Sequence, residues 1–337
     1  MHRYRFTMPD KRTLVANLVL LVLAGAAVMT SLSMGTVQIA PAEVIRALTG
    51  TTVDPMAAFV INELRLSRVM AGLLSGAALA LAGCLMQTLA RNRLATPGII
   101  GIDNAATAFA VASVVGTGIA LAPSAMALAG AATATVLAFG LAGANGTRGY
   151  RFIVAGLGIG AIAGAVTQVM LSQVAIDDAN AAYPWTVGSL NARTPESVQL
   201  LALGLAVGWL ALMFLSRAVN SLQFSDPVAI TLGIKLKRTR LLGLGLSVLM
   251  TGLAVSVCGP VGLVALLAPE LARSLCRPGK VPLTASALAG AGFMVVADLL
   301  GRTLLSPLEI PVGIITAIVG SPYLLWILLR PSTRSLT

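Results

Sequence analysis

Charged side chains are scarce in this sequence of 337 residues, where they make up 10% against about 25% in soluble domains. Hydrophobic residues make up 57%, and the mean hydropathy is +0.91. Apolar runs of about 20 residues recur along the whole length, and each can cross a bilayer only as a helix that satisfies its own backbone. The composition therefore excludes a soluble protein and predicts an all-α polytopic membrane protein.

Histidine, paired cysteines and nucleotide-binding motifs are also lacking. His2 is the only histidine, which excludes histidine-based metal ligation or acid–base catalysis within the bundle. The three cysteines, Cys84, Cys258 and Cys276, show no CxxC spacing, so we expect core residues rather than a disulfide or a metal site. Gly279-Lys280 lacks the rest of a P-loop. We predict no catalytic residue, no metal site and no cofactor, so any ATP hydrolysis belongs to another subunit.

Ten apolar runs predict about ten transmembrane helices in a single domain, residues 1–337, with both termini on one side. The first run continues past Ala24-Gly25-Ala26, which looks like a cleavage site, so we expect an uncleaved helix rather than a signal peptide. The runs cover residues 14–34, 66–90, 97–117, 119–142, 152–175, 197–216, 241–258, 261–276, 283–301 and 310–329.

The net charge of +11 is concentrated in alternate connections between these runs. This is the positive-inside pattern of a protein in membrane lipid, not a nucleic-acid surface, and it predicts cytoplasmic termini. Eighteen of the 23 basic residues lie on the predicted cytoplasmic side: Arg3, Arg5, Lys11, Arg12, Arg91, Arg93, Arg148, Arg151, Arg217, Lys235, Lys237, Arg238, Arg240, Arg273, Arg277, Lys280, Arg330 and Arg334.

Five basic residues oppose this pattern, and three of them are informative. Arg65 and Arg68 are three residues apart, so they share a helical face at the start of the second run. Arg302 follows Asp298 by four residues, which predicts an i,i+4 ion pair. Interfacial snorkelling and the docking of an external partner both explain these arginines, and the residues alone leave both open. The other two are Arg46 and Arg193.

Residues 221–240 form the longest polar interruption between two strongly apolar runs. Ser225-Asp226-Pro227 predicts a helix start with Asp226 as N-cap and Pro227 as the first helical residue, and Gly233 ends the segment. A short cytoplasmic helix that contacts a partner is one interpretation. A basic loop that only fixes topology is the other.

Two further patterns concern packing and the outer surface. Glycines at four-residue spacing predict close helix packing in lipid at Gly72 and Gly76, at Gly156, Gly160 and Gly164, and at Gly204 and Gly208. Residues 177–196 predict a polar outer loop, with Tyr183-Pro184-Trp185 at the interface and a helix start at Thr194-Pro195. That loop is either an aromatic anchor or a segment that gates a pathway.

Five stretches carry a specific resemblance to a known family: residues 63–101, Trp-Thr-Val-Gly-Ser-Leu at 185–190, and residues 226–233, 258–273 and 297–330. They resemble the permease subunits of bacterial importers for iron-siderophore complexes, haem and vitamin B12. The resemblance implies the type II ABC importer permease fold, with two permease subunits of ten helices, two cytoplasmic ATP-binding subunits and a periplasmic substrate-binding protein.

The resemblance also implies roles for particular residues. The loop after the sixth helix would insert into the ATPase, through Ser225, Asp226, Pro227, Ala229, Leu232, Gly233 and Ile234. Arg65, Arg68 and Arg302 would receive carboxylates from the binding protein. The sequence departs from the family at Arg93, where proline is common, at Glu270, where histidine is common, at Ser67, which is usually proline, and at Pro227, where proline is not usual.

We therefore predict a permease subunit of the bacterial inner membrane that passes a ferric siderophore through a pathway at the subunit interface. Haem or vitamin B12 is the alternative cargo, and an ion-coupled secondary carrier is the alternative from another class. Whether the second permease is a copy or a related chain stays open. Candidate pathway and outer-gate residues are Gly156, Gly160, Gly164, Gln168, Trp185, Gly188 and Ser189.

Overall fold

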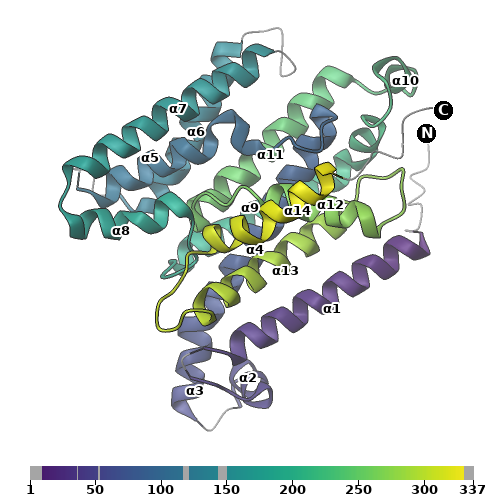
Figure 1. The fold of residues 1–337 in the computed structure, drawn as a ribbon. Helices are drawn as coiled ribbons and strands as arrows, with labels where there is room; N and C mark the ends of the chain where they lie inside the picture. Colours follow the sequence, from purple (N-terminus) through teal and green to yellow (C-terminus); the bar gives the residue numbers. More distant parts are fainter. Residues whose placement is uncertain (1–9, 36, 52–53, 117–120, 143–149, 330–337) are drawn as a thin grey trace.

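The structure is a computed structural model that describes residues 10–35, 37–51, 54–116, 121–142 and 150–329. In these ranges the chain is helical throughout and contains no strand (Figure 1). The elements are α1 (Lys11–Ser33), α2 (Pro41–Leu48), α3 (Pro55–Phe59), the π-helical turn η1 (Val60–Arg65), α4 (Leu66–Ala90), the 3-10 turn η2 (Pro97–Ile100), α5 (Ile102–Val114), α6 (Pro123–Ala142), α7 (Tyr150–Gln173), α8 (Ile176–Val187), α9 (Pro195–Ser221), α10 (Asp226–Thr231), α11 (Leu236–Cys258), α12 (Val264–Leu275), α13 (Leu283–Thr303) and α14 (Val312–Leu329).

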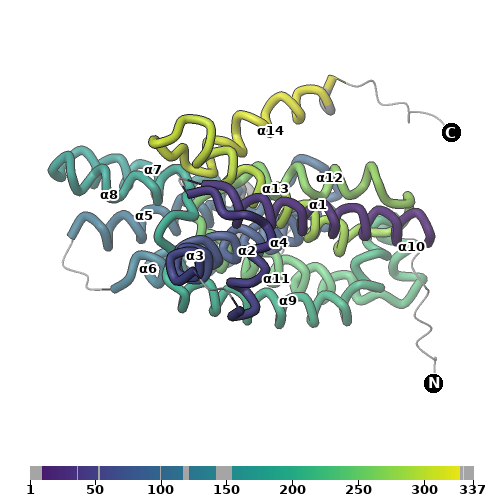
Figure 2. Tube along the Cα trace, turned by 90° about the horizontal axis from the view of Figure 1, so that it is seen from below, coloured from purple at the N-terminus to yellow at the C-terminus, as the bar shows by residue number. Residues whose placement is uncertain are grey.

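Helix α4 lies at the centre of the bundle, between α13 and α12 on one side and α11 and α9 on the other (Figure 2). Its glycines bring backbones together. A Cβ atom added at Gly76 would lie 2.3 Å from the carbonyl oxygen of Gly290, and one at Gly83 would lie 1.9 Å from that of Ala265. The predicted small-residue packing is therefore confirmed for α4, whose neighbours approach as closely as helices in lipid require.

The other predicted glycine positions differ among themselves. Gly204 and Gly208 on α9 make room for the side chains of Leu253 and Met250 on α11. Gly164 on α7 faces open space, with no atom within 4 Å of an added Cβ. Among the described residues, the predicted packing contacts are therefore present at Gly204 and Gly208 but absent at Gly164.

Each of the ten predicted spans becomes a helix, and α5 and α12 are the shortest of the ten. Helix α5 has 13 residues and α12 has 12, so they are about 18–20 Å long against a hydrocarbon core of about 30 Å. Among the described residues, seven helices are long and apolar enough to cross. Both helices are shorter than the runs that predicted them, because the third run also covers η2 and the eighth also covers the three residues before Val264.

The bundle has two chemically different ends. At the first, which we call the α10 end, α1 begins and α14 finishes, and most of the predicted cytoplasmic basic residues lie there (Figure 1). At the second, the α3 end, lie α2, α3 and the start of α4. Arg3, Arg5, Arg148, Arg330 and Arg334 fall outside the described residues.

Residues 177–196 are not the loop that the sequence predicted. Residues Ile176–Val187 form α8, with Asp177 and Asp178 in its first turn, where carboxylates oppose the positive end of the helix dipole. Trp185 is 7% exposed rather than interfacial. The helix start is confirmed, because Thr194 is the N-cap of α9 and Pro195 is its first residue.

Candidate functional sites at the two ends of the bundle

The N-cap of α10 lies one residue earlier than the sequence predicted. Ser225 is the N-cap, with extended backbone angles, and Asp226 is already helical. The Asp226 carboxylate accepts hydrogen bonds from Arg91 and Arg240, each at 2.8 Å. Gly233 follows the helix at φ +80°, a conformation that glycine adopts without strain, so the predicted end is confirmed.

Arg91 fastens the α10 segment to the central helix. It follows the last residue of α4 at φ +50° and extends across the turn before α10. Its guanidinium donates to the carbonyl oxygen of Leu222 at 3.0 Å, to that of Phe224, and to Asp226. Three acceptors on one planar cation fix both position and direction, so a displacement of α10 is transmitted to α4.

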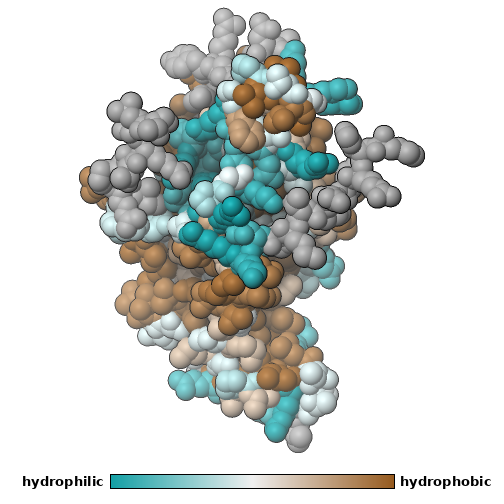
Figure 3. Space-filling view, turned by 90° about the vertical axis from the view of Figure 1, so that its right-hand side faces the viewer, coloured by the Kyte–Doolittle hydropathy of each residue, from teal (hydrophilic) through white to brown (hydrophobic). Residues whose placement is uncertain are grey.

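The outer face of α10 is apolar and uncovered. Four apolar side chains are 44–59% exposed, namely Phe224, Val228, Ile230 and Leu232, whereas Ala229 is fully buried against the bundle. Ser225, Pro227 and Gly233 are exposed as well, and Ile234 is half-buried. In Figure 3 a brown apolar patch stands out in the α10 region amid teal polar residues. An apolar centre with a basic border, from Lys235, Lys237 and Arg238, has the character of a protein-binding surface.

A second set of ion pairs joins the α4–α5 connection to α12. Arg93 and Glu270, two of the positions that depart from the family pattern, bond to each other at 3.0 Å. Glu270 also accepts from Arg273 at 3.1 Å, and Arg273 donates to Gln87 on α4. Both departures are visible in the sequence, but their pairing is not, because Arg93 and Glu270 are 177 residues apart.

At the α3 end, Arg65 and Arg302 are internal rather than snorkelling. Arg65 is 6% exposed and donates to the carbonyl oxygens of Leu32, at 2.5 Å, and Val37. Arg302 donates to the hydroxyl of Ser31 at 2.6 Å and to its carbonyl oxygen. The snorkelling interpretation is therefore wrong for both, since each guanidinium holds the end of α1 where carbonyls have no helical partner.

Arg68 differs from them because one of its two carboxylate partners is exposed. It bonds to Asp298 at 2.9 Å and to Glu309, also at 2.9 Å, and Glu309 is 45% exposed. The predicted pair of Arg302 with Asp298 is confirmed at 3.6 Å. Asp298, only 5% exposed, thus sits between two arginines.

A cavity of about 450 Å³ opens at the α3 end, and the charged residues that line it are Glu63, Arg65, Arg68, Arg193, Arg302 and Glu309. Arg193 donates to the carbonyl oxygen of Ser189 and lies 4.1 Å from the centre of the Trp185 ring. Burial lowers the pKa of Arg193 to about 10, so it is still charged at neutral pH. The sequence showed Arg193 only as an exception to the charge pattern and did not place it in this cavity.

The predicted gate residues lie inside the bundle, at a junction of three backbones. Ser189 N–H donates to the carbonyl oxygen of Cys258 at 2.8 Å, and Gly313 N–H donates to that of Gly188 at 3.2 Å. Trp185 accepts from Thr107 through its carbonyl oxygen. Gly188, at φ +84°, has no room for a side chain, since an added Cβ would lie 2.6 Å from the Pro260 oxygen. The segment after α8 is therefore joined to α5, α11 and α14.

The predicted pathway residues on α7 do not share one environment. Gly156 and Gly160 are buried against Gly101, where an added Cβ at Gly101 would lie 2.6 Å from the Gly156 oxygen. They are packing positions within this chain, and their role in a pathway stays a prediction. Gln168 is exposed and Gly164 is half-buried on the uncovered side of the helix.

Residues 20–330 match the FecCD transport family. The chain belongs to this family. It is similar to the achromobactin transport system permease protein CbrC of Dickeya dadantii, at 36% identity over 97% of this chain and 95% of that protein. It is also similar to the ferric enterobactin transport system permease protein FepG of Escherichia coli, at 32% identity over 96% of this chain and 98% of FepG.

The fold agrees with this assignment. A metal-chelate type ABC transporter in an inward-facing conformation superposes with a TM-score of 0.82, at 24% identity, over 94% of this chain and 99% of that one. The FecCD chain is thus a multi-pass permease with the type II ABC importer fold, of the iron-siderophore and vitamin B12 kind. It is the non-catalytic transport component of a bacterial importer that includes an ATPase and a binding protein.

Proposed function

We propose that this FecCD permease passes a ferric siderophore across the bacterial inner membrane. The observation that carries the proposal is nearly full-length similarity to permeases named for achromobactin and ferric enterobactin. Permeases named for Fe(3+)-citrate are similar too, at 35% identity in Bacillus subtilis. The alternative cargo rests on the cobalamin import permease of Halobacterium salinarum, at 32% identity over 84% of this chain.

The α10 end is the cytoplasmic end in this proposal, and α10 is the contact with the ATPase. Two observations support it: the basic residues gather at this end, and the uncovered apolar face of α10 is fastened to α4 by Arg91. Closure of the ATPase dimer on ATP would move α10 and shift the bundle between outward- and inward-facing packings. Both termini are cytoplasmic in this arrangement.

The second permease subunit is a related chain rather than a copy. Escherichia coli has two different similar proteins, FepG and FepD, that are both named for the ferric enterobactin system. Helix α7 presents an uncovered apolar face through Val154, Leu157 and Ile162, so it supports an interface there. The pathway would run along this interface past Gln168, and the junction at Trp185, Gly188 and Ser189 would close its outer end.

The binding protein docks at the α3 end, over the arginine-lined cavity. Arg65 and Arg302 are already occupied by α1, so they shape the cavity instead of reaching outward. Arg68 is the residue that an incoming carboxylate reaches, by taking the place of the half-exposed Glu309. Ion pairs of this kind set orientation and association rate and weaken with salt.

The test of the cargo is uptake into proteoliposomes that hold the whole importer, with its own ATPase and binding protein. Ferric siderophore, haem and cobalamin are offered separately, each with radiolabelled metal. We expect ATP-dependent accumulation of a ferric siderophore alone. Accumulation of cobalamin or haem instead would overturn the cargo, and uptake driven by an ion gradient without ATPase would favour a secondary carrier.

A further inference from the structure

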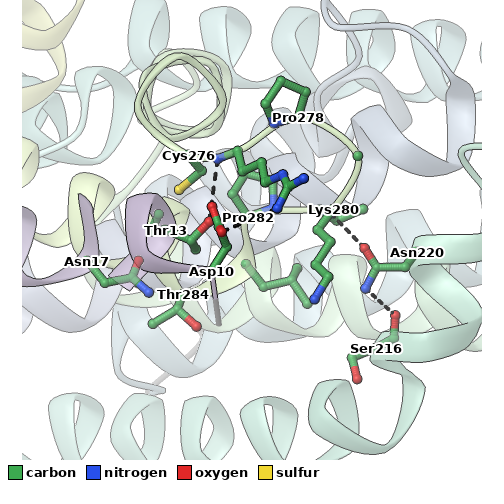
Figure 4. A pocket seen from close by; sticks show the side chains of 15 residues that line it. Asp10, Thr13, Asn17, Ser216, Asn220, Cys276, Pro278, Lys280, Pro282 and Thr284 are labelled. Atoms are coloured by element: carbon green, nitrogen blue, oxygen red, sulfur yellow. Dashed lines mark hydrogen bonds and ion pairs between the residues drawn. The ribbon is translucent and has the colours of Figure 1, made fainter. Parts of the chain in front are cut away.

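A second cavity, of about 750 Å³, opens at the α10 end and belongs to neither site described above. It lies between the first turns of α1, the end of α9 and the connection from α12 to α13 (Figure 4). Its volume is within the range of about 300–1,000 Å³ that is usual for small-molecule sites. The cavity is therefore large enough to hold a polar headgroup.

Positive charge lines one wall of this cavity. Arg277 and Lys280 both come from the α12–α13 connection, and the single acidic residue on the lining is Asp10, which pairs with Arg277 at 3.3 Å. The first turn of α13 also faces the cavity through Thr284 and Ala285. The amides of a helix's first turn have no intrahelical acceptor, and the dipole favours an anion there.

The opposite wall supplies hydrogen-bonding groups. Thr13 and Asn17 are one turn apart on α1, and Ser216 lies across from them on α9. Figure 4 shows Asn17 next to Thr284. The side-chain oxygen of Asn17 is buried and has no hydrogen-bond donor among the described residues. A ligand that brings a hydroxyl group would satisfy this acceptor.

The surroundings indicate where the ligand comes from. Next to the cavity, α1 and α9 carry exposed apolar side chains, including Leu18 and Leu21 on α1 and Met213 and Phe214 on α9. In a membrane these side chains face acyl chains, so the cavity lies where a lipid headgroup meets the protein. Basic pockets between transmembrane helices on the cytoplasmic side suit anionic lipids.

We propose that this cavity binds the headgroup of an anionic phospholipid with free hydroxyls, of the phosphatidylglycerol type. The phosphate faces Arg277, Lys280 and the first turn of α13, and a glycerol hydroxyl donates to Asn17. The leaflet follows from the cytoplasmic assignment of the α10 end under the proposed function. The binding itself requires only the permease, so it is measured without cargo, ATPase or binding protein.

The experiment is native mass spectrometry of the purified, delipidated permease, titrated separately with phosphatidylglycerol, phosphatidic acid and phosphatidylcholine. We expect phosphatidylglycerol to bind most tightly, then phosphatidic acid, which lacks the hydroxyls, then phosphatidylcholine. The double substitution Arg277→Gln and Lys280→Gln should raise the Kd for phosphatidylglycerol roughly 30-fold, because it removes two cations near the membrane surface. Asn17→Leu should lower the affinity for phosphatidylglycerol to that for phosphatidic acid.

The matched control is Lys237→Gln with Arg238→Gln, which removes the same charge from exposed positions at the same end. An equal loss in the control would overturn the site, because only general surface charge would then matter. Displacement of the lipid by inorganic phosphate at equal concentration would show a free-anion site instead. Equal binding of phosphatidylglycerol and phosphatidylcholine would also refute the proposal. These lipid-binding results do not depend on siderophore uptake, so a failure of the cargo proposal can be told apart from a failure of the lipid proposal.

Discussion

Removing the Arg91 side chain tests whether α10 is mechanically joined to the central helix. Arg91→Ala deletes three hydrogen bonds that lead from the end of α4 to the turn before α10. Glycine is unsuitable as a replacement, because the residue has φ +50° and glycine would also relieve backbone strain. Arg91→Lys keeps the charge but not the planar fork, so it retains part of the attachment.

The magnitude follows from the exposure of the groups. The side chains of Arg91 and Asp226 are 35% and 33% exposed, so solvent screening limits their ion pair to about 0.5 kcal/mol. Two bonds from the guanidinium to backbone carbonyls add about 1 kcal/mol each at this exposure. The total of about 2–2.5 kcal/mol corresponds to a roughly 30- to 60-fold shift from attached toward released α10.

The assay compares ATP hydrolysis and cargo uptake in the same proteoliposomes. We expect Arg91→Ala to lower cargo moved per ATP at least tenfold while hydrolysis continues, and to speed amide hydrogen exchange in α10. Arg93→Ala is the matched control, because it removes a neighbouring arginine whose partner is Glu270 on α12, not α10. An unchanged uptake ratio in Arg91→Ala, or an equal fall in Arg93→Ala, would refute the reasoning.

Three further predictions follow from single contacts. Glu309→Gln removes the carboxylate that pairs with Arg68, so the binding protein should bind the permease up to about fivefold more tightly in titrations at low salt. Glu43→Gln, at the same end, should leave the Kd of the binding protein unchanged. Gly83→Ala places a Cβ 1.9 Å from the Ala265 oxygen and should cost about 1–3 kcal/mol, seen as a lower melting temperature in detergent. Gly158→Ala, with open space around it, should not lower that temperature, and a fall there would sink the packing argument. A double-mutant cycle of Arg93→Ala and Glu270→Ala should give a stability coupling of about 0.2–1 kcal/mol, since Arg93 is 68% exposed, and zero coupling would mean that the pair is not formed.

Local sequence patterns predicted the elements whose cause is local. The end of α10, the Thr194-Pro195 start of α9 and the pair of Asp298 with Arg302 all depend on residues within one or two turns. Helix α8 was missed for a related reason. The polar character of residues 177–196 predicted a loop, although the acidic residues Asp177 and Asp178 also suit the first turn of a helix.

Long-range partners were beyond such patterns. The carbonyls that receive Arg65 lie 28 and 33 residues away, on the other side of α2 and α3 in the sequence. The partnership of Arg93 with Glu270 spans 177 residues. Helix length is also hard to read from hydropathy, because the apolar run at 261–276 does not show that α12 begins only at Val264.

The arginines at the α3 end show that a charge pattern alone does not reveal what each arginine contacts. Basic residues on the outer side oppose the insertion bias, so each one needs a compensating interaction. For Arg65 and Arg302 that compensation is internal, since they satisfy the last carbonyls of α1 and close the bundle there. Only Arg68 faces a carboxylate that is itself half-exposed, and Arg193 adds charge to the same cavity. A binding protein that docks here therefore competes with Glu309 for one arginine, so its affinity depends more on Arg68 than on the number of arginines.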